Sequence, residues 1–173
     1  EKKIDEVFEM PPLFDDSYYG FTIHEIREMQ LINMGNYAHG NQPIQHLIYL
    51  YNYAGKPQKA QAKLREVMEK LYTPTPDGYC GDEDNGQTSA WYGFSALGFY
   101  PVTPASDNYI LGNPLFKTVS LQLPEGKKFL IKSVARNSDN NLVEYVQLNG
   151  KKIEGFEVPF GAFRENGTLT FFR

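Results

Sequence analysis

Three consecutive carboxylates stand between two glycines near the middle of the chain. Residues 81–87 read GDEDNGQ and run directly into the apolar stretch TSAWYGFSALGFYPV. In extended backbone Asp82 and Asp84 would point the same way and Glu83 the opposite way, because side chains alternate along it. Carboxylates placed together can act as acid, as base or as ligands of a hard cation. The simpler interpretation is a solvated surface turn whose Asp84 or Asn85 caps the helix that follows.

The acidic loop does not match an EF-hand. Counting from Asp82, an EF-hand needs Gly at position six and Glu at position twelve, whereas Gly86 lies at five and Gly93 at twelve. A hard cation bound by one carboxylate and by oxygens from elsewhere is left open. Cys80 has no evident histidine base, and the sequence holds no Gly-x-Ser-x-Gly elbow or phosphate loop. Any chemistry of this chain would therefore use carboxylates.

A second polar constellation, YAHGNQP at 37–43, leads into a predicted helix. The simpler interpretation is that Asn41 or Gln42 caps this helix and that His39 is an exposed loop residue. The functional interpretation is that a loop rich in amide and imidazole donors meets the acidic loop at the helix ends. Such a pair of loops suits a polyhydroxylated ligand and a metal bound through oxygen. His46 is expected to pack or to lie on the surface, and Trp91 to belong to the core.

Helical hairpins are the elements expected to position the two loops. Apolar spacing, prolines and a Gly-Lys-Pro link predict antiparallel helices over 43–54 and 57–72. A third helix over 87–99 is apolar on every face, so it has to be surrounded. Residues 1–38 predict two short helices around a proline-containing loop. Because the third helix has few helical partners, either the following β unit packs against it or the chain is part of a larger body.

The second part of the chain has the period of two that is typical of strands. From about residue 106, short alternating segments are separated by Glu-Gly, Asn/Asp/Asn and Asn-Gly turns. QLNGKKI predicts a hairpin, because Asn149-Gly150 suits both positive-φ positions of a type I′ turn. Helices followed by strands indicate an α+β fold, with a helical unit over 1–105 and a small antiparallel β unit over 106–173.

Composition excludes some classes of partner. The chain has 173 residues, 22% of them charged, and a formal charge of -4, and it has no dense Lys/Arg cluster. Nucleic acid and membrane surfaces are therefore not expected partners. One cysteine, Cys80, rules out an internal disulfide. No signal peptide is visible and the first residue is not Met, so we expect a processed protein or an excised piece.

Several long segments carry a family resemblance. YAHGNQPIQHLIYLYNYAGKP, LYTPTPDGYCGDEDNGQTSAWYGFSALGFYPVTPAS and YILGNPLF, in this order, resemble the C-terminal part of glycoside hydrolase family 92. The likeness covers about 36–116. This family comprises calcium-dependent, exo-acting α-mannosidases, typically secreted or periplasmic, with an N-terminal β-sandwich joined to an (α/α)6 barrel and sugar bound between them. The resemblance implies that this chain holds the last helical hairpins of the barrel and the terminal β unit, and that the rest of its own polypeptide is its partner.

The resemblance also implies a mechanism and roles for residues. Single-step hydrolysis with inversion needs a general acid and a general base, roughly 6.5–9.5 Å apart. Asp82 and Asp84 match the family's base region. Asn41 and Asp84 match its ligands for Ca²⁺, which binds the 2- and 3-hydroxyls of mannose. His39 and Gln42 match sugar contacts, although many relatives carry Glu at the position of Gln42.

An absence from the sequence limits the functional expectation. Nothing in residues 1–36 resembles the "TEGN"-like stretch that holds the family's general acid. We therefore expect half of an active site, which acts within an enzyme on mannose-containing glycans, with the α-1,2 linkage as the expected one. The alternative is a non-catalytic carbohydrate-binding or protein-interaction module in which the β unit recognises the partner. A third option is that residues 106–173 only cover the open end of the helices.

Overall fold

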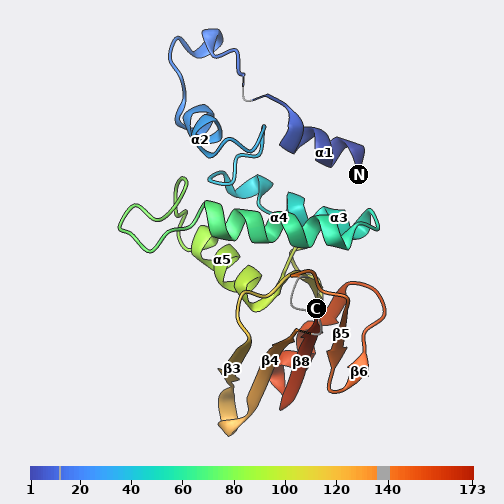
Figure 1. Cartoon of the computed structure of the whole chain (residues 1–173). Coiled ribbons are helices and arrows are strands. Elements are labelled where there is room, and N and C mark those ends of the chain that lie inside the picture. Colours follow the sequence, from blue (N-terminus) through green and yellow to red (C-terminus); the bar gives the residue numbers. More distant parts are fainter. Residues whose placement is uncertain (12, 136–140) are drawn as a thin grey trace.

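The computed structural model describes residues 1–11, 13–135 and 141–173 (Figure 1). Helices precede strands along the chain, which confirms the α+β prediction. The α-helices are α1 (Lys2–Glu9), α2 (His24–Ile32), α3 (Leu50–Tyr53), α4 (Pro57–Lys70) and α5 (Gln87–Leu97). The strands are β1 (Phe99–Tyr100), β2 (Asn108–Leu111), β3 (Thr118–Gln122), β4 (Lys128–Val134), β5 (Tyr145–Leu148), β6 (Lys151–Lys152), β7 (Glu157–Pro159) and β8 (Gly167–Phe172). Within the described ranges no helix has both the length and the apolar character needed to cross a bilayer.

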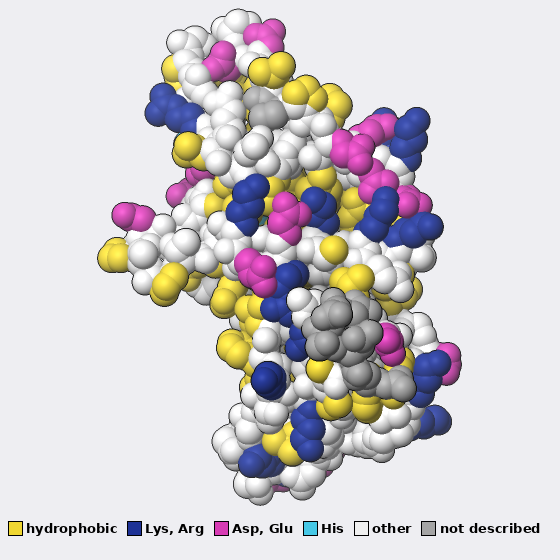
Figure 2. Space-filling model, in the orientation of Figure 1, with side chains coloured by type: hydrophobic (Ala, Val, Ile, Leu, Met, Phe, Trp, Pro, Cys, Tyr) yellow, Lys and Arg dark blue, Asp and Glu magenta, His cyan; other side chains and the backbone are white. Residues whose placement is uncertain are grey.

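The helices lie in layers on one side of the sheets. α1 and α2 cover one side of the α3–α4 pair, and the five-stranded sheet lies at the opposite end of the molecule (Figure 1). The predicted apolar face of α4 is confirmed, because all five of its residues are buried: Ala60, Leu64, Val67, Met68 and Leu71. Charged side chains of both signs are interspersed over α1 and the start of α4 on the face shown in Figure 2. The (α/α)6 barrel to which these helices would belong stays a prediction.

The helix predicted over 43–54 forms only in part. Two 3-10 turns, Gln42–Ile44 and Leu47–Tyr49, precede the single turn of α3. The carbonyl of Gln45 accepts the indole N–H of Trp91 at 3.0 Å, while the N–H of Tyr49 bonds to the carbonyl three residues back. The ladder of a regular helix is thus interrupted by a contact with α5, which lies far away in the sequence.

The α5 helix is buried on one side and exposed on the other. Trp91 and Ala96 are buried in the helical core, whereas Ala90 and Gly93 are exposed. Phe94 packs on Phe99 from the β region, with ring centroids 5.9 Å apart. The β unit therefore packs against this helix, as the first of the two predicted alternatives required, but it does not surround it.

The strands form two sheets. β1, β2 and β7 make an antiparallel sheet in the order β1-β2-β7. The larger sheet has the order β3-β4-β8-β5-β6, and in it β4 and β8 run parallel, so the prediction of a wholly antiparallel unit was wrong. Parallel strands need a long connection between them, and here the connection from β4 to β8 contains β5, β6 and β7. β8 then lies between β4 and β5 in the sheet. The Asn149-Gly150 turn is confirmed, with φ of 51° and 80°, whereas the Asn/Asp/Asn turn at 137–140 lies outside the described residues.

Each unit has its own apolar core. One core lies among the helices around Tyr37, Tyr49, Leu64 and Trp91, and the other lies among the strands around Phe129. Phe94 contacts both cores. The domain boundary between residues 105 and 106 stays a prediction, and β1 pairs across it with β2.

Candidate active site

The acidic loop makes a left-handed turn at the start of α5. Asp84, Asn85 and Gly86 have φ of 55°, 54° and 100°. Asp, Asn and Gly are the residues that adopt this conformation at least cost. The Glu83 carbonyl accepts the Thr88 N–H at 3.1 Å and closes the turn. Asp82 and Asp84 were expected to point the same way in extended backbone. This arrangement is not formed, because Asp84 already belongs to the turn.

Glu83 uses both carboxylate oxygens to hold the end of the helix. One oxygen accepts the Gly86 N–H at 2.7 Å and the other accepts the Ser89 hydroxyl at 2.6 Å. The bonds from Ser89 and Gly86 lower the pKa of Glu83. Asp84 or Asn85 was expected to cap α5, but the cap residue is Gly86, and Glu83 accepts its free N–H instead.

The other two carboxylates are open to solvent to different degrees. The Asp82 side chain is 71% exposed, and one of its oxygens lies 3.9 Å from Nε2 of His24 on α2. Asp84 is half-buried. Neither side chain caps α5, since Glu83 does so. The three adjacent acids thus separate into one structural carboxylate and two that are available for other contacts.

His39 is buried, not exposed as the simpler interpretation of its loop expected. The Tyr37 hydroxyl lies 2.7 Å from Nδ1, and the Tyr72 hydroxyl lies 2.7 Å from Nε2. The Trp91 ring packs edge-on, with centroids 4.4 Å apart. Burial lowers the pKa of His39 to about 3, so the ring is neutral at physiological pH. Both ring nitrogens are engaged inside the chain.

Asn41 and Gln42 begin the first 3-10 turn. Asn41 is exposed and Gln42 is half-buried. Asn41 occupies the cap position, but its side chain makes no capping bond, contrary to the simpler interpretation. Its amide oxygen is thus not used to hold the turn. His46, which was expected to pack or to lie on the surface, is exposed.

The two loops touch through their glycines. A Cβ placed on Gly81 would lie 2.6 Å from the Cα of Gly40 and 2.5 Å from a carboxylate oxygen of Glu28. Only residues without a side chain permit such a close approach. The expectation that the 37–43 loop meets the acidic loop is confirmed. Asn41 follows Gly40 and Asp82 follows Gly81, so each of these two candidate residues is one position from the backbone contact.

Glu28 of α2 is a third carboxylate at this junction, and sequence reasoning missed it. Burial raises its pKa, and the neighbouring carboxylates of Asp82, Glu25 and Asp84 raise it further, against the opposing effect of His24. No local pattern distinguishes Glu28 from the other polar residues of its helix. Its position becomes apparent only when α2 is placed against Gly40 and Gly81.

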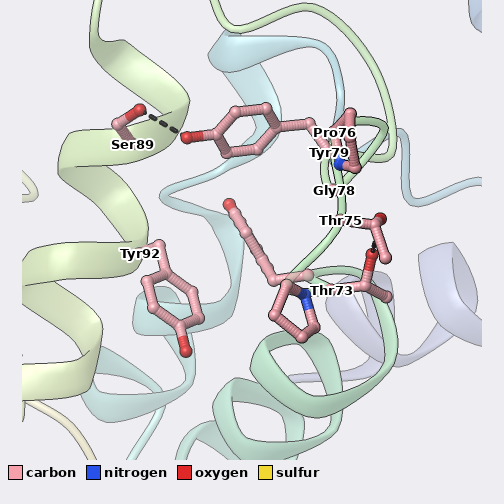
Figure 3. A pocket seen from close by; sticks show the side chains of 9 residues that line it. Thr73, Thr75, Pro76, Gly78, Tyr79, Ser89 and Tyr92 are labelled. Atoms are coloured by element: carbon pink, nitrogen blue, oxygen red, sulfur yellow. Dashed lines mark hydrogen bonds between the residues drawn. The ribbon is translucent and has the colours of Figure 1, made fainter.

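A pocket of about 550 Å³ adjoins the acidic loop on another side (Figure 3). It is lined by residues of the α4–α5 link and of α5, namely Tyr72, Thr73, Pro74, Thr75, Pro76, Gly78, Tyr79, Ser89 and Tyr92. The Tyr79 and Ser89 hydroxyls lie 2.7 Å apart, and Ser89 donates to Glu83. Tyr79 therefore donates to Ser89. The pocket wall is linked to the structural carboxylate and contains none of the predicted site residues.

The sequence matches one family model over residues 1–172, that of the glycosyl hydrolase family 92 catalytic domain. The chain belongs to glycosyl hydrolase family 92. The match extends well beyond residues 36–116, where the resemblance was first apparent.

Solved structures of family 92 proteins have the same fold over this region. An α-mannosidase from Bacteroides thetaiotaomicron in complex with mannoimidazole aligns with a TM-score of 0.82 and 33% identity over 99% of this chain and 21% of that chain. An inverting mannosidase from Bacteroides thetaiotaomicron aligns with a TM-score of 0.77 and 49% identity over 98% of this chain and 23% of that chain.

A curated relative of this family 92 chain comes from Arthroderma benhamiae and is named an uncharacterized secreted glycosidase. It is 28% identical over 133 residues, which are 75% of this chain and 17% of the relative. The chain thus spans about a fifth of the length of the proteins that it matches.

Proposed function

We propose that this chain is part of an exo-acting α-mannosidase, to which it contributes the loops that carry the general base and calcium ligands. The observation that carries the proposal is the contact between Gly40 and Gly81, because it joins the backbone of the loop that holds Asn41 and Gln42 to the backbone of the loop that holds Asp82. Family membership supports it, as do the relatives described as an α-mannosidase and as an inverting mannosidase. The proposed reaction is hydrolysis with inversion, and the proposed substrate is α-1,2-linked mannose of glycans.

Asp82 or Asp84 serves as the general base in this proposal. A base must activate a water molecule on the face of the sugar opposite the leaving group. Glu83 is excluded from that role, because its two oxygens hold Gly86 and Ser89. A carboxylate that binds a cation is a weaker base than one that does not. The two aspartates are therefore expected to differ in role, one as base and one as calcium ligand.

Asn41 and Asp84 would hold the calcium ion. Their side chains offer the amide and carboxylate oxygens that this cation prefers, on two loops in backbone contact. They fit as part of a ligand shell, since calcium takes roughly six to eight oxygens and the sugar and water can supply others. When bound, the ion would coordinate two neighbouring hydroxyls of mannose. Asn41 is exposed and its side chain makes no capping hydrogen bond, so its amide oxygen is available to bind the ion.

Gln42 is the proposed side-chain contact to sugar from this chain. It is half-buried and stands next to Asn41 at the loop junction. His39 was assigned the same role by resemblance, and its position suggests an indirect one. Tyr37 and Tyr72 are hydrogen-bonded to the two ring nitrogens of His39. His39 would therefore stabilise the loop from the interior, and its neighbours would contact the sugar.

The general acid would come from the remainder of the polypeptide. The chain spans about a fifth of the length of its relatives. We accordingly propose that the 173-residue chain alone does not hydrolyse mannosides efficiently. Export of the whole protein is a further part of the proposal, in line with the relative that is named a secreted glycosidase.

The test uses the full-length protein and an α-1,2-mannobioside. Asp82→Asn and Asp84→Asn are compared with Asp77→Asn, which changes an exposed carboxylate in the same link. The variant that lacks the base should lose about a hundredfold to ten-thousandfold in kcat at every calcium concentration. The variant that lacks a calcium ligand should recover activity as the calcium concentration is raised. A chelator should abolish the hydrolytic activity of the wild type.

Three outcomes would contradict the proposal. Full activity of both variants would leave Asp82 and Asp84 as surface residues. Robust, chelator-insensitive turnover by the 173-residue chain would refute the half-site. Tight binding of the glycan with no hydrolysis by the full-length protein would favour a non-catalytic binding module.

A further inference from the structure

Gln45 occupies the interior between the two loops of the candidate active site. Its side chain is 1% exposed, and so is that of Thr88 in the first turn of α5. The Gln45 amide nitrogen donates to the carbonyl of His39 at 3.1 Å and to the hydroxyl of Thr88 at 3.2 Å. The Thr88 hydroxyl in turn donates to the carbonyl of Asp82 at 3.0 Å. An unbroken chain of hydrogen bonds thus joins the backbone of one loop to that of the other.

The backbone and the remaining oxygen of Gln45 are also held. Its amide oxygen accepts the Gln87 side chain at 3.3 Å, and its carbonyl accepts the Trp91 indole at 3.0 Å. All donors and acceptors of the Gln45 side chain are therefore used, and its orientation is determined. The Trp91 contact is the one that interrupts the predicted helix at Gln45.

A second route runs through His39. The Tyr72 hydroxyl donates to the Thr88 carbonyl at 3.4 Å, so the His39 Nε2–H donates to Tyr72 and Nδ1 accepts from Tyr37. Both routes start in the 37–43 loop and reach Thr88 in the first turn of α5, and the first route continues from there to Asp82. His39, Gln45 and Thr88 are buried, and a hydrogen bond is strengthened where little water competes for it.

From this geometry we infer that Gln45 and Thr88 are positioning residues, which set the placement of the base loop relative to the loop that carries Asn41 and Gln42. The inference rests on the proposed function and deepens it. Both residues are only 1% exposed, so neither would touch the sugar. Groups of an active site must be held within about 0.5 Å of their productive geometry, and a misplacement of about 1 Å can cost a hundredfold in rate.

The test replaces Thr88 of the full-length protein by a residue of the same shape that lacks the hydroxyl. Thr88→Val should lower kcat on an α-1,2-mannobioside about tenfold to a hundredfold, because the Asp82 carbonyl loses its anchor. Thr88→Ser keeps the hydroxyl and should restore kcat. Ser95→Ala is the matched control, since it removes a buried hydrogen bond of 2.9 Å between Tyr49 and the same helix without touching either loop. It should lower the melting temperature and leave kcat unchanged.

A second variant covers the case in which Thr88→Val does not fold. Gln45→Met keeps the length of the side chain but loses both donors, and it should lower kcat and raise KM together, because Gln45 holds both loops. A Thr88→Val protein with wild-type kcat, or a Thr88→Ser protein as impaired as Thr88→Val, would overturn the inference while leaving the proposed function intact. A full-length wild type with no α-mannosidase activity would overturn both.

Discussion

Adjacent residues of the same type have different duties in the acidic loop. Glu83 is bonded to Gly86 and Ser89 and stabilises the start of α5. The side chain of Asp82 projects into solvent instead, with an exposed fraction of 71%. This division follows from the left-handed turn at Asp84, because the turn brings the Gly86 N–H within reach of Glu83. Residue type alone therefore did not separate the structural acid from the candidate catalytic acids.

Glu28 should lower stability at neutral pH. Its pKa is raised by burial and by nearby carboxylates, so the native state disfavours its charge relative to the unfolded state. Glu28→Gln should raise the melting temperature of the chain at pH 7. As pH falls through the raised pKa, wild-type Glu28 becomes protonated in the native state, and the difference should disappear below about 4.5. Melting curves over roughly pH 4 to pH 8, a range that begins below the ordinary pKa of this carboxyl, would check this.

The control for Glu28 is Glu154→Gln, which changes an exposed glutamate of the β region. This control should show no such pH-dependent gain. A lower melting temperature of Glu28→Gln at pH 7 would mean that the carboxylate is held by contacts stronger than the repulsion at the junction.

The helices are attached to one another by contacts of different kinds. α4 uses a buried apolar face, as its spacing predicts, whereas α1 has no buried residue. Asp5 of α1 instead accepts the Tyr51 hydroxyl at 2.7 Å and the Lys59 ammonium at 2.8 Å. Phe8 adds a ring contact with Tyr37, with centroids 4.9 Å apart. α1 therefore depends on charge and on aromatic contact, within the mixed-charge surface seen in Figure 2.

Removal of the Asp5 charge should loosen α1 in a pH-dependent manner. Bonds from Lys59 and Tyr51 lower the pKa of Asp5 below its ordinary 3.8, so its extra stability is present above pH 3.8 and is lost as pH falls through the lowered pKa. Asp5→Asn should thus lower the melting temperature at pH 7, and the difference should close in strong acid. Added salt should shrink the difference at pH 7, because exposed ion pairs are screened. A difference that is independent of both pH and salt would contradict this account.

The two apolar cores are joined by buried polar contacts as well as by Phe94. Gln61 of α4 accepts the Val143 N–H at 2.7 Å and donates to the Val143 carbonyl at 3.3 Å. The amide of Asn52 donates to the Leu111 carbonyl at 3.4 Å, from the α3 helix to β2. Since β1 pairs with β2 across residue 105, the helical and β parts share a sheet as well. The molecule is therefore expected to unfold in one transition.

Gln61→Met tests the connection between the two parts. The change keeps the length of the side chain but leaves the buried N–H and carbonyl of Val143 without partners, at a cost of about 2–4 kcal/mol in the free energy of unfolding. Gln58→Met, at an exposed position of the same helix, should cost less than about 0.5 kcal/mol. Urea unfolding followed by circular dichroism and by Trp91 fluorescence would measure both. Two separate transitions in the wild type would contradict the single cooperative unit.

The sequence by itself determined the features that depend on neighbours along the chain. The apolar face of α4, the Asn149-Gly150 turn, the order of helices before strands and the motifs of the two loops were all readable from local spacing and residue type. The family resemblance came from the same local segments, and the match over residues 1–172 confirmed it. Local spacing is sufficient here because a helix face or a tight turn involves residues only a few positions apart.

Only the tertiary structure decided the features that join distant residues. The burial of His39, the approach of Glu28 to Gly40 and Gly81, and the bond from Gln45 to Thr88 link residues separated by many positions along the chain. The parallel pairing of β4 with β8 is of the same kind. No periodicity encodes such contacts, because each depends on how whole elements pack and on which buried polar groups remain to be satisfied once they have done so.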